Sequence, residues 1–132
     1  MYNAQYFIDR YKPIPDRLWV KGHYVQRLKF LGTTLIEKHC ALGHLGDIGS
    51  SKSRTAESQA IMDLFRIHLH KSVPTVNDGL CLEYQQKTPK ERVLAALEEI
   101  KELEQEAIQT DSAVQEVNNL LTKQAFVTEQ YL

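Results

Sequence analysis

The chain has 132 residues, about the length of one domain, and 42% of them are apolar while 25% are charged. That composition argues against two compact domains and against wholesale disorder. The 16 Lys and Arg residues nearly cancel the 17 Asp and Glu residues, but residues 1–90 hold 13 basic and 8 acidic side chains, whereas residues 91–132 hold 3 and 9. We therefore expect a basic front and an acidic rear.

The chain begins with a predicted helix over residues 3–12, because Asn3 is a good N-cap and apolar side chains follow it at helical spacing. Residues 18–31 are rich in strand-forming side chains and predict one long strand or a short hairpin. A helix is the alternative, since part of this stretch also fits a period of 3.6 residues. A turn at Gly32 is followed by a brief second strand that ends near residue 37.

The middle of the chain alternates predicted helices with glycine-containing turns. Residues 40–46 and 55–70 predict helices, and the loop between them is rich in Gly and Ser. Asn77, Asp78 and Gly79 form the clearest turn signal, so we expect residues 75–84 to complete the antiparallel sheet. The predicted fold class is α+β, a small antiparallel sheet near residues 18–37 and 75–84 that is covered by helices.

The rear of the chain is predicted to be helical. Thr88, Pro89 and Glu91 form a capping box that starts a helix over residues 89–108. A second apolar face follows, so either an αα-hairpin or one long bent helix closes the chain. We expect one α+β domain over residues 1–108 and a C-terminal helical extension over residues 109–132.

Several protein classes lack their usual sequence support. The chain has no apolar run of the roughly 20 residues that span a bilayer and no signal-peptide core, so we expect a cytoplasmic protein with reduced Cys40 and Cys81. Walker, G-x-G-x-x-G, C-x-x-C, G-x-S-x-G and H-E-x-x-H motifs are absent from the sequence. We accordingly expect no cofactor.

Three stretches carry a resemblance to a family. They are Cys-Ala-Leu-Gly-His-Leu-Gly at residues 40–46, Asn-Asp-Gly at residues 77–79 and Thr-Pro-Lys-Glu-Arg-Val-Leu-Ala-Ala-Leu at residues 88–97. In this order they resemble a family of small uncharacterised bacterial and phage proteins, a domain of unknown function, over residues 2–104. The resemblance implies a shared fold and leaves the function open.

Cys40 and His44 are the first candidates for chemistry. Four residues apart on a helix, their side chains would share one face, and a helix N-terminus with a nearby imidazole would favour the thiolate of a nucleophile. Asp78 or Asn77 could then orient His44 as the third catalytic residue. The alternative is structural, with Cys40 as a small buried residue and His44 at a helix end.

A metal site is the second candidate. His39, Cys40, His44 and His68 offer nitrogen and sulfur ligands for a tetrahedral zinc. His68 and His70 would point to different faces of a helix, and no paired ligand motif anchors the site. Scattered core and surface histidines are the alternative.

Association is the third candidate. Basic residues interleaved with aromatic ones before residue 39 could bind nucleic acid, although the acidic rear disfavours it. The apolar faces of the C-terminal helices need cover, from their own domain or from a second chain. We expect a non-enzymatic accessory protein of bacterial or phage origin that acts through protein association as a homodimer. The alternatives are a cysteine-dependent hydrolase or transferase and a nucleic-acid binder.

Overall fold

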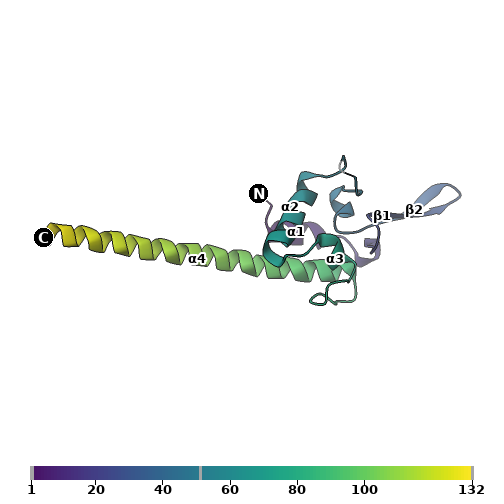
Figure 1. Cartoon of the computed structure of the whole chain (residues 1–132). Coiled ribbons are helices and arrows are strands. Elements are labelled where there is room, and N and C mark those ends of the chain that lie inside the picture. Colours follow the sequence, from purple (N-terminus) through teal and green to yellow (C-terminus); the bar gives the residue numbers. More distant parts are fainter. Residues whose placement is uncertain (1, 51, 132) are drawn as a thin grey trace. The chain divides into compact units, whose positions relative to one another are not determined.

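A computed structural model describes residues 2–50 and 52–131, with side chains as far as residue 123. Helices and one hairpin follow one another along the chain (Figure 1). The elements are α1 (Ala4–Tyr11), η1 (Asp16–Leu18), β1 (Val25–Phe30), β2 (Thr33–His39), η2 (Gly43–Leu45), α2 (Ala56–Leu64), η3 (Phe65–Leu69), α3 (Val73–Asn77) and α4 (Pro89–Tyr131). The α+β class, with an antiparallel sheet and a long C-terminal helix, is confirmed.

The helix starts follow the capping residues in the sequence. The Asn3 side chain accepts a hydrogen bond from the Tyr6 backbone at 2.9 Å and caps α1. Thr88 accepts from the backbone N–H of Glu91 at 3.1 Å and caps α4. Thr55 and Ser58 form a reciprocal capping box that begins α2.

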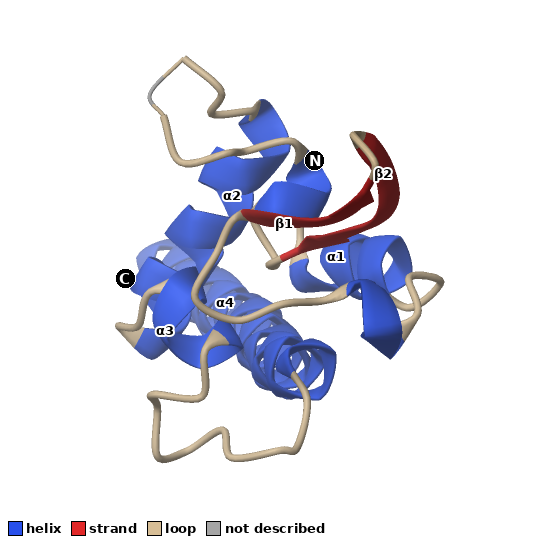
Figure 2. Ribbon diagram, turned by 90° about the vertical axis from the view of Figure 1, so that its right-hand side faces the viewer, coloured by secondary structure: helices blue, strands red, loops and turns tan. Residues whose placement is uncertain are grey.

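The core of the first unit is helical. Figure 2 shows α1, α2, α3 and the start of α4 grouped together, and Figure 1 shows the hairpin to one side of the helices of this unit. Each helix buries its apolar stripe, and the largest buried side chains include Phe7, Tyr11, Ile61, Phe65, Val76 and Leu97. The predicted helix over residues 55–70 is found as α2 followed by η3, a π-helical stretch that ends on His70 with a positive φ of 56°.

The sheet is smaller than the sequence predicts. Its two strands are β1 and β2, which pair antiparallel through a two-residue turn at Leu31 and Gly32, both with positive φ. Between Leu28 and Lys29 the register shifts by a bulge. Residues 18–24 are not a strand, because η1 and Gly22, with φ of 78°, break the extended run.

The prediction of a strand over residues 75–84 is wrong. Ser72 caps a short helix there, α3, with Pro74 in its first turn. Asn77 is the last residue of α3 and Gly79, with φ of 75°, follows the helix end. Asn-Asp-Gly therefore terminates a helix instead of joining two strands.

The C-terminal region is one continuous helix, so the αα-hairpin alternative is wrong. The predicted helix over residues 40–46 is found only as the single turn η2, which ends at Gly46. The chain divides into two units, Met1–Lys101 and Glu102–Leu132. In the described residues, no helix is both long enough and apolar enough to span a membrane.

Candidate functional site

Cys40 and Asp78 meet at a small hollow of about 110 Å³. Its lining residues are Gly22, His23, Tyr24, Cys40, Pro74 and Asp78. The carboxylate of Asp78 accepts a hydrogen bond from the Gly22 backbone at 2.9 Å, which ties the end of α3 to the loop before β1. His44 does not line this hollow, whereas His23 does, a residue that no sequence motif had singled out.

The Cys40 side chain is buried, with 6% of the residue exposed. Burial raises the pKa of its thiol, against the opposing effect of nearby backbone N–H groups such as Gly43, whose N–H lies 3.4 Å from Sγ. The neutral thiol is therefore the dominant form at pH 7. A cysteine nucleophile needs the opposite shift.

His44 packs in an aromatic cluster instead of facing Cys40. Its ring centroid lies 4.6 Å from that of Trp19 and 5.1 Å from that of His39. Burial, with smaller effects of His39 and Arg10, lowers the pKa of His44 to about 4, so the imidazole is neutral at pH 7. Among the described residues, Nε2 of His44 and Nε1 of Trp19 are buried and have no hydrogen-bond partner.

The four residues considered for a metal do not share one site. His39 is engaged through Nε2 with the carboxylate of Glu37 at 2.9 Å, and His68 lies on the separate stretch η3. Within residues 2–50 and 52–123, no three His, Cys, Asp or Glu side chains are grouped so that they could hold a metal ion. Zinc needs about four such ligands around one point.

Asn77 is the centre of a buried hydrogen-bond network. Its side-chain Oδ1 accepts from the Ala41 backbone at 3.0 Å, and its Nδ2 donates to the Val20 carbonyl at 2.9 Å. The Asn77 carbonyl accepts from Nη2 and Nε of Arg92 at 2.7 and 3.2 Å. Arg92 also donates to the Gln86 carbonyl at 2.8 Å. Two backbone carbonyl groups therefore accept hydrogen bonds from a guanidinium group whose residue is only 7% exposed.

This network joins the three stretches 40–46, 77–79 and 88–97 that the sequence singles out. Ala41 belongs to the first stretch, Asn77 to the second and Arg92 to the third. The sequence indicated Asn77 only as a turn residue or as a group orienting a histidine. Its hydrogen bonds serve backbone groups and Arg92, so its role in the structure is to hold three segments together.

The second unit presents an exposed apolar row on α4. Ala107, Thr110, Val114, Val117 and Leu121, here called the tail row, follow one another at alternating steps of four and three. Each is exposed, with 54% of Val114, 55% of Val117 and 58% of Leu121 accessible. On a helix this spacing places all five on one face.

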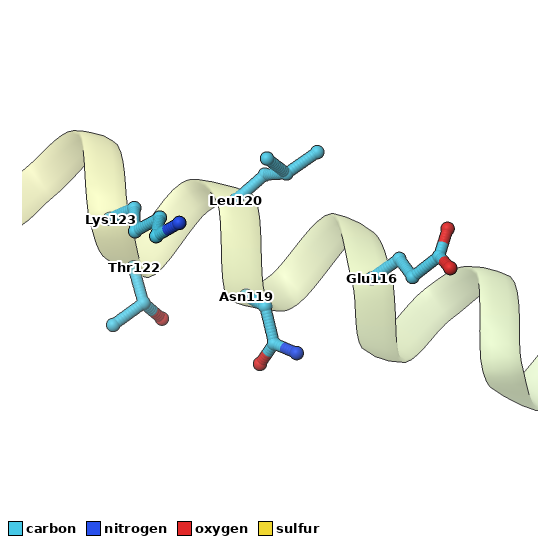
Figure 3. Close-up of a pocket in the computed structure, with 5 residues that line it drawn as sticks. All are labelled: Glu116, Asn119, Leu120, Thr122 and Lys123. Carbon is cyan, nitrogen blue, oxygen red and sulfur yellow. The ribbon is translucent and has the colours of Figure 1, made fainter.

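Other faces of the same helix are more polar. Figure 3 shows Leu120 on the opposite side of the helix from Asn119 and Thr122. These side chains and Glu116 and Lys123 stand on an open helix surface in the described part of the chain. Ile108 and Leu120 are also exposed on this helix, but the tail row is the longest run of aligned, mainly apolar side chains in residues 102–123, here called the tail segment.

Comparison of the chain with family models, with curated proteins and with solved structures found no match.

Proposed function

We propose that the protein is a non-enzymatic accessory protein, of the small bacterial and phage kind that its motifs resemble, and that it acts by self-association. The tail segment binds a second copy of the chain. The observation that supports this is the tail row, in which Val114, Val117 and Leu121 are each more than half exposed on one helix face. Contiguous apolar surface of this kind marks interaction sites.

The Cys40 site offers less support for a catalytic function. Its thiol has a raised pKa, and His44 lies in the cluster with Trp19 and His39 instead of at the hollow. A nucleophile and its base must come within hydrogen-bond reach of each other. Catalysis would require His44 to move toward Cys40, whereas association through the tail row requires no movement of either residue.

The tail row can be tested by placing charge in its centre. In Val117→Glu/Leu121→Glu, each chain loses about 2 kcal/mol of apolar burial at the interface, or about 4 kcal/mol in a dimer. This corresponds to a dissociation constant that is larger by a factor on the order of a thousand. Sedimentation equilibrium of the full chain over a range of concentrations measures the change.

Asn119→Glu is the matched control, because at 100° per residue Asn119 lies on the face opposite Val117 and Leu121 of the same helix. We expect this variant to associate as the native chain does. A native chain that stays monomeric at about 100 µM, a concentration well above a micromolar dissociation constant, would contradict the proposed function. Equal weakening by the control and the double variant would remove the tail row as the contact.

A further inference from the structure

The hairpin carries a second exposed apolar face. Side chains alternate along a strand, so Leu28 and Phe30 of β1 share a face. Ile36 is the cross-strand partner of Leu28 and lies on the same face. These three residues, here called the hairpin face, are exposed, Leu28 by 58% and Phe30 by 62%.

This face lies on a sheet that has only two strands, and Figure 1 shows the hairpin reaching away from the helices of its own unit. A two-stranded sheet is marginally stable in water unless its apolar face is packed against another element. A shallow hollow of about 260 Å³ lies on it, lined by Gln26, Arg27, Leu28, Ile36 and Lys38. The hairpin face therefore has room for apolar side chains of a partner.

The margin of the hairpin face is basic. Lys38 lines the hollow and, as the cross-strand partner of Gln26, shares the face of Leu28, whereas the Arg27 side chain alternates to the other face, where it is paired with Glu37 at 3.1 Å. Over residues 25–39 the hairpin has three Lys and Arg residues against one Glu. An occupant with carboxylates beside its apolar side chains would complement this margin.

The tail segment has that chemistry. It contains five Asp and Glu residues and a single Lys. At 100° per residue, Glu106 and Asp111 lie on either side of the tail row. The same helix thus offers a central apolar row and acidic flanks, complementary to the apolar centre and basic margin of the hairpin face.

We infer that the tail row of one copy packs on the hairpin face of a second copy, an assignment that rests on the proposed self-association. The contact covers both apolar surfaces at once and sets carboxylates of the tail beside Lys38. A pairing of two tails would leave the hairpin face exposed. It would also bring like charges together, since in a parallel helix pair Glu106 faces Asp111 of the second copy.

The first test removes the apolar centre of the hairpin face. Leu28→Ser/Phe30→Ser changes two exposed side chains, and we expect the dissociation constant to rise at least tenfold in sedimentation equilibrium of the full chain. Leu82→Ser is the matched control, because Leu82 is 88% exposed outside the hairpin. Circular dichroism verifies that both variants are folded.

A charge reversal is expected to change the strength of association in opposite directions for the two ways of pairing. If the tail row packs on the hairpin face, Glu106→Lys weakens association severalfold, and adding Lys38→Glu restores part of the loss. If two tails pair, Glu106→Lys places a cation opposite Asp111 and strengthens association. Raising the salt concentration reduces either effect.

A mixing experiment identifies the two surfaces directly. Val117→Glu/Leu121→Glu keeps the hairpin face, and Leu28→Ser/Phe30→Ser keeps the tail row. Each variant alone is expected to be mainly monomeric, while an equimolar mixture forms a one-to-one complex. That complex has one of the two contacts intact.

The outcomes separate this inference from the proposed function. Undiminished association of Leu28→Ser/Phe30→Ser, together with tighter association of Glu106→Lys, would overturn the hairpin contact and leave self-association through the tail row in place. A monomeric native chain would overturn both. Failure of the two variants to form a mixed complex, with the native chain associated, would overturn only the hairpin contact.

Discussion

Replacement of the buried amide of Asn77 tests what holds the first unit together. In Asn77→Asp, one carboxylate oxygen can still accept from the Ala41 N–H, but the second replaces the group that donates to the Val20 carbonyl at 2.9 Å. The new charge would also lie beside Asp78, which accepts from Nδ2 of Asn77 at 3.0 Å. Asn77 has no exposed surface, so solvent cannot relieve either repulsion.

The expected loss is large relative to the stability of a small domain. Asn77→Ala leaves two buried backbone groups without partners and costs about 2–4 kcal/mol. Asn77→Asp adds a buried carboxylate beside Asp78, which the Arg92 cation at the residue 77 carbonyl offsets only in part, and costs about 3–5 kcal/mol at pH 7. A domain of this size has a free energy of unfolding of about 5–15 kcal/mol, so the Asp variant loses a large share of it.

The Asp variant also acquires a pH dependence with a defined sign. Burial raises the pKa of the introduced carboxyl group above its unfolded value of about 3.9. The unfolded state then releases that proton at lower pH than the folded state does, so the deficit in stability grows as pH rises above about 4. Below that pH, the protonated carboxyl can donate to the Val20 carbonyl.

Urea unfolding measured at pH 7 and pH 4 provides the assay. The chain has one tryptophan, Trp19, which is 4% exposed and stacks on His44, so its fluorescence reports unfolding of the first unit. Asp78→Asn is the control, because it keeps an oxygen for the Gly22 N–H and should cost less than about 1 kcal/mol. A free energy of unfolding for Asn77→Asp within about 0.5 kcal/mol of the native value at pH 7 would refute the reasoning.

Four further measurements test individual sites. An added Cβ in Gly43→Ala would overlap the backbone oxygen of Tyr24, so we expect a loss of about 3 kcal/mol in urea unfolding, and a loss below about 1 kcal/mol would contradict the close contact. Leu31 has φ of 51° in the hairpin turn, and Leu31→Asn should slow amide hydrogen exchange in the hairpin about two- to fivefold; unchanged exchange would argue against strain there. The pKa of His44 is lowered to about 4 by burial, so native stability should fall as pH drops from about 6.5 to 4, by about 1–2 kcal/mol after allowance for partial exposure, and His44→Phe should remove this dependence. Cys40, whose thiol pKa is raised by burial, should react with iodoacetamide at pH 7 far more slowly in the native than in the unfolded chain, and equal rates would contradict its burial.

Local signals predicted the helix starts well. Asn3, Thr55 and Thr88 each cap a helix, as their side-chain oxygens and the following spacing indicate. These predictions succeeded because a cap bonds to backbone only three residues away. The information needed for them is therefore contained in a short window of sequence.

The errors came from residues whose conformation depends on context. Val73, Thr75 and Val76 favour a strand by propensity, but Ser72 and Pro74 supply a helix start and the two valines are fully buried in the core. Asn-Asp-Gly suits a hairpin turn and a helix end equally well, because both need a positive φ. The helix end forms here, because α3 buries Val73 and Val76 in the core.

The sequence suggests Cys40, His44 and Asp78 as one catalytic group. Cys40 and Asp78 do line one hollow, but His44 does not, although it is four residues from Cys40. Residues four apart meet on one face only if the helix is continuous, whereas here the chain forms the single 3₁₀ turn Gly43–Leu45. His44 instead packs against Trp19, which precedes β1, and His39, the last residue of β2. Contacts between residues that are distant in sequence, such as that with Trp19, produce no periodic pattern in the sequence.

One residue from each of the stretches 40–46, 77–79 and 88–97 enters the same buried hydrogen-bond network. Ala41, Asn77 and Arg92 form a buried polar network, and a network of this kind must be fully satisfied to be tolerated, which restricts the residues around it without any requirement for catalysis. The uneven charge has a separate origin. If the tail row packs on the hairpin face, an acidic segment and a basic hairpin in one chain complement each other between copies, so the near-zero net charge of −1 hides two surfaces of opposite charge that bind each other.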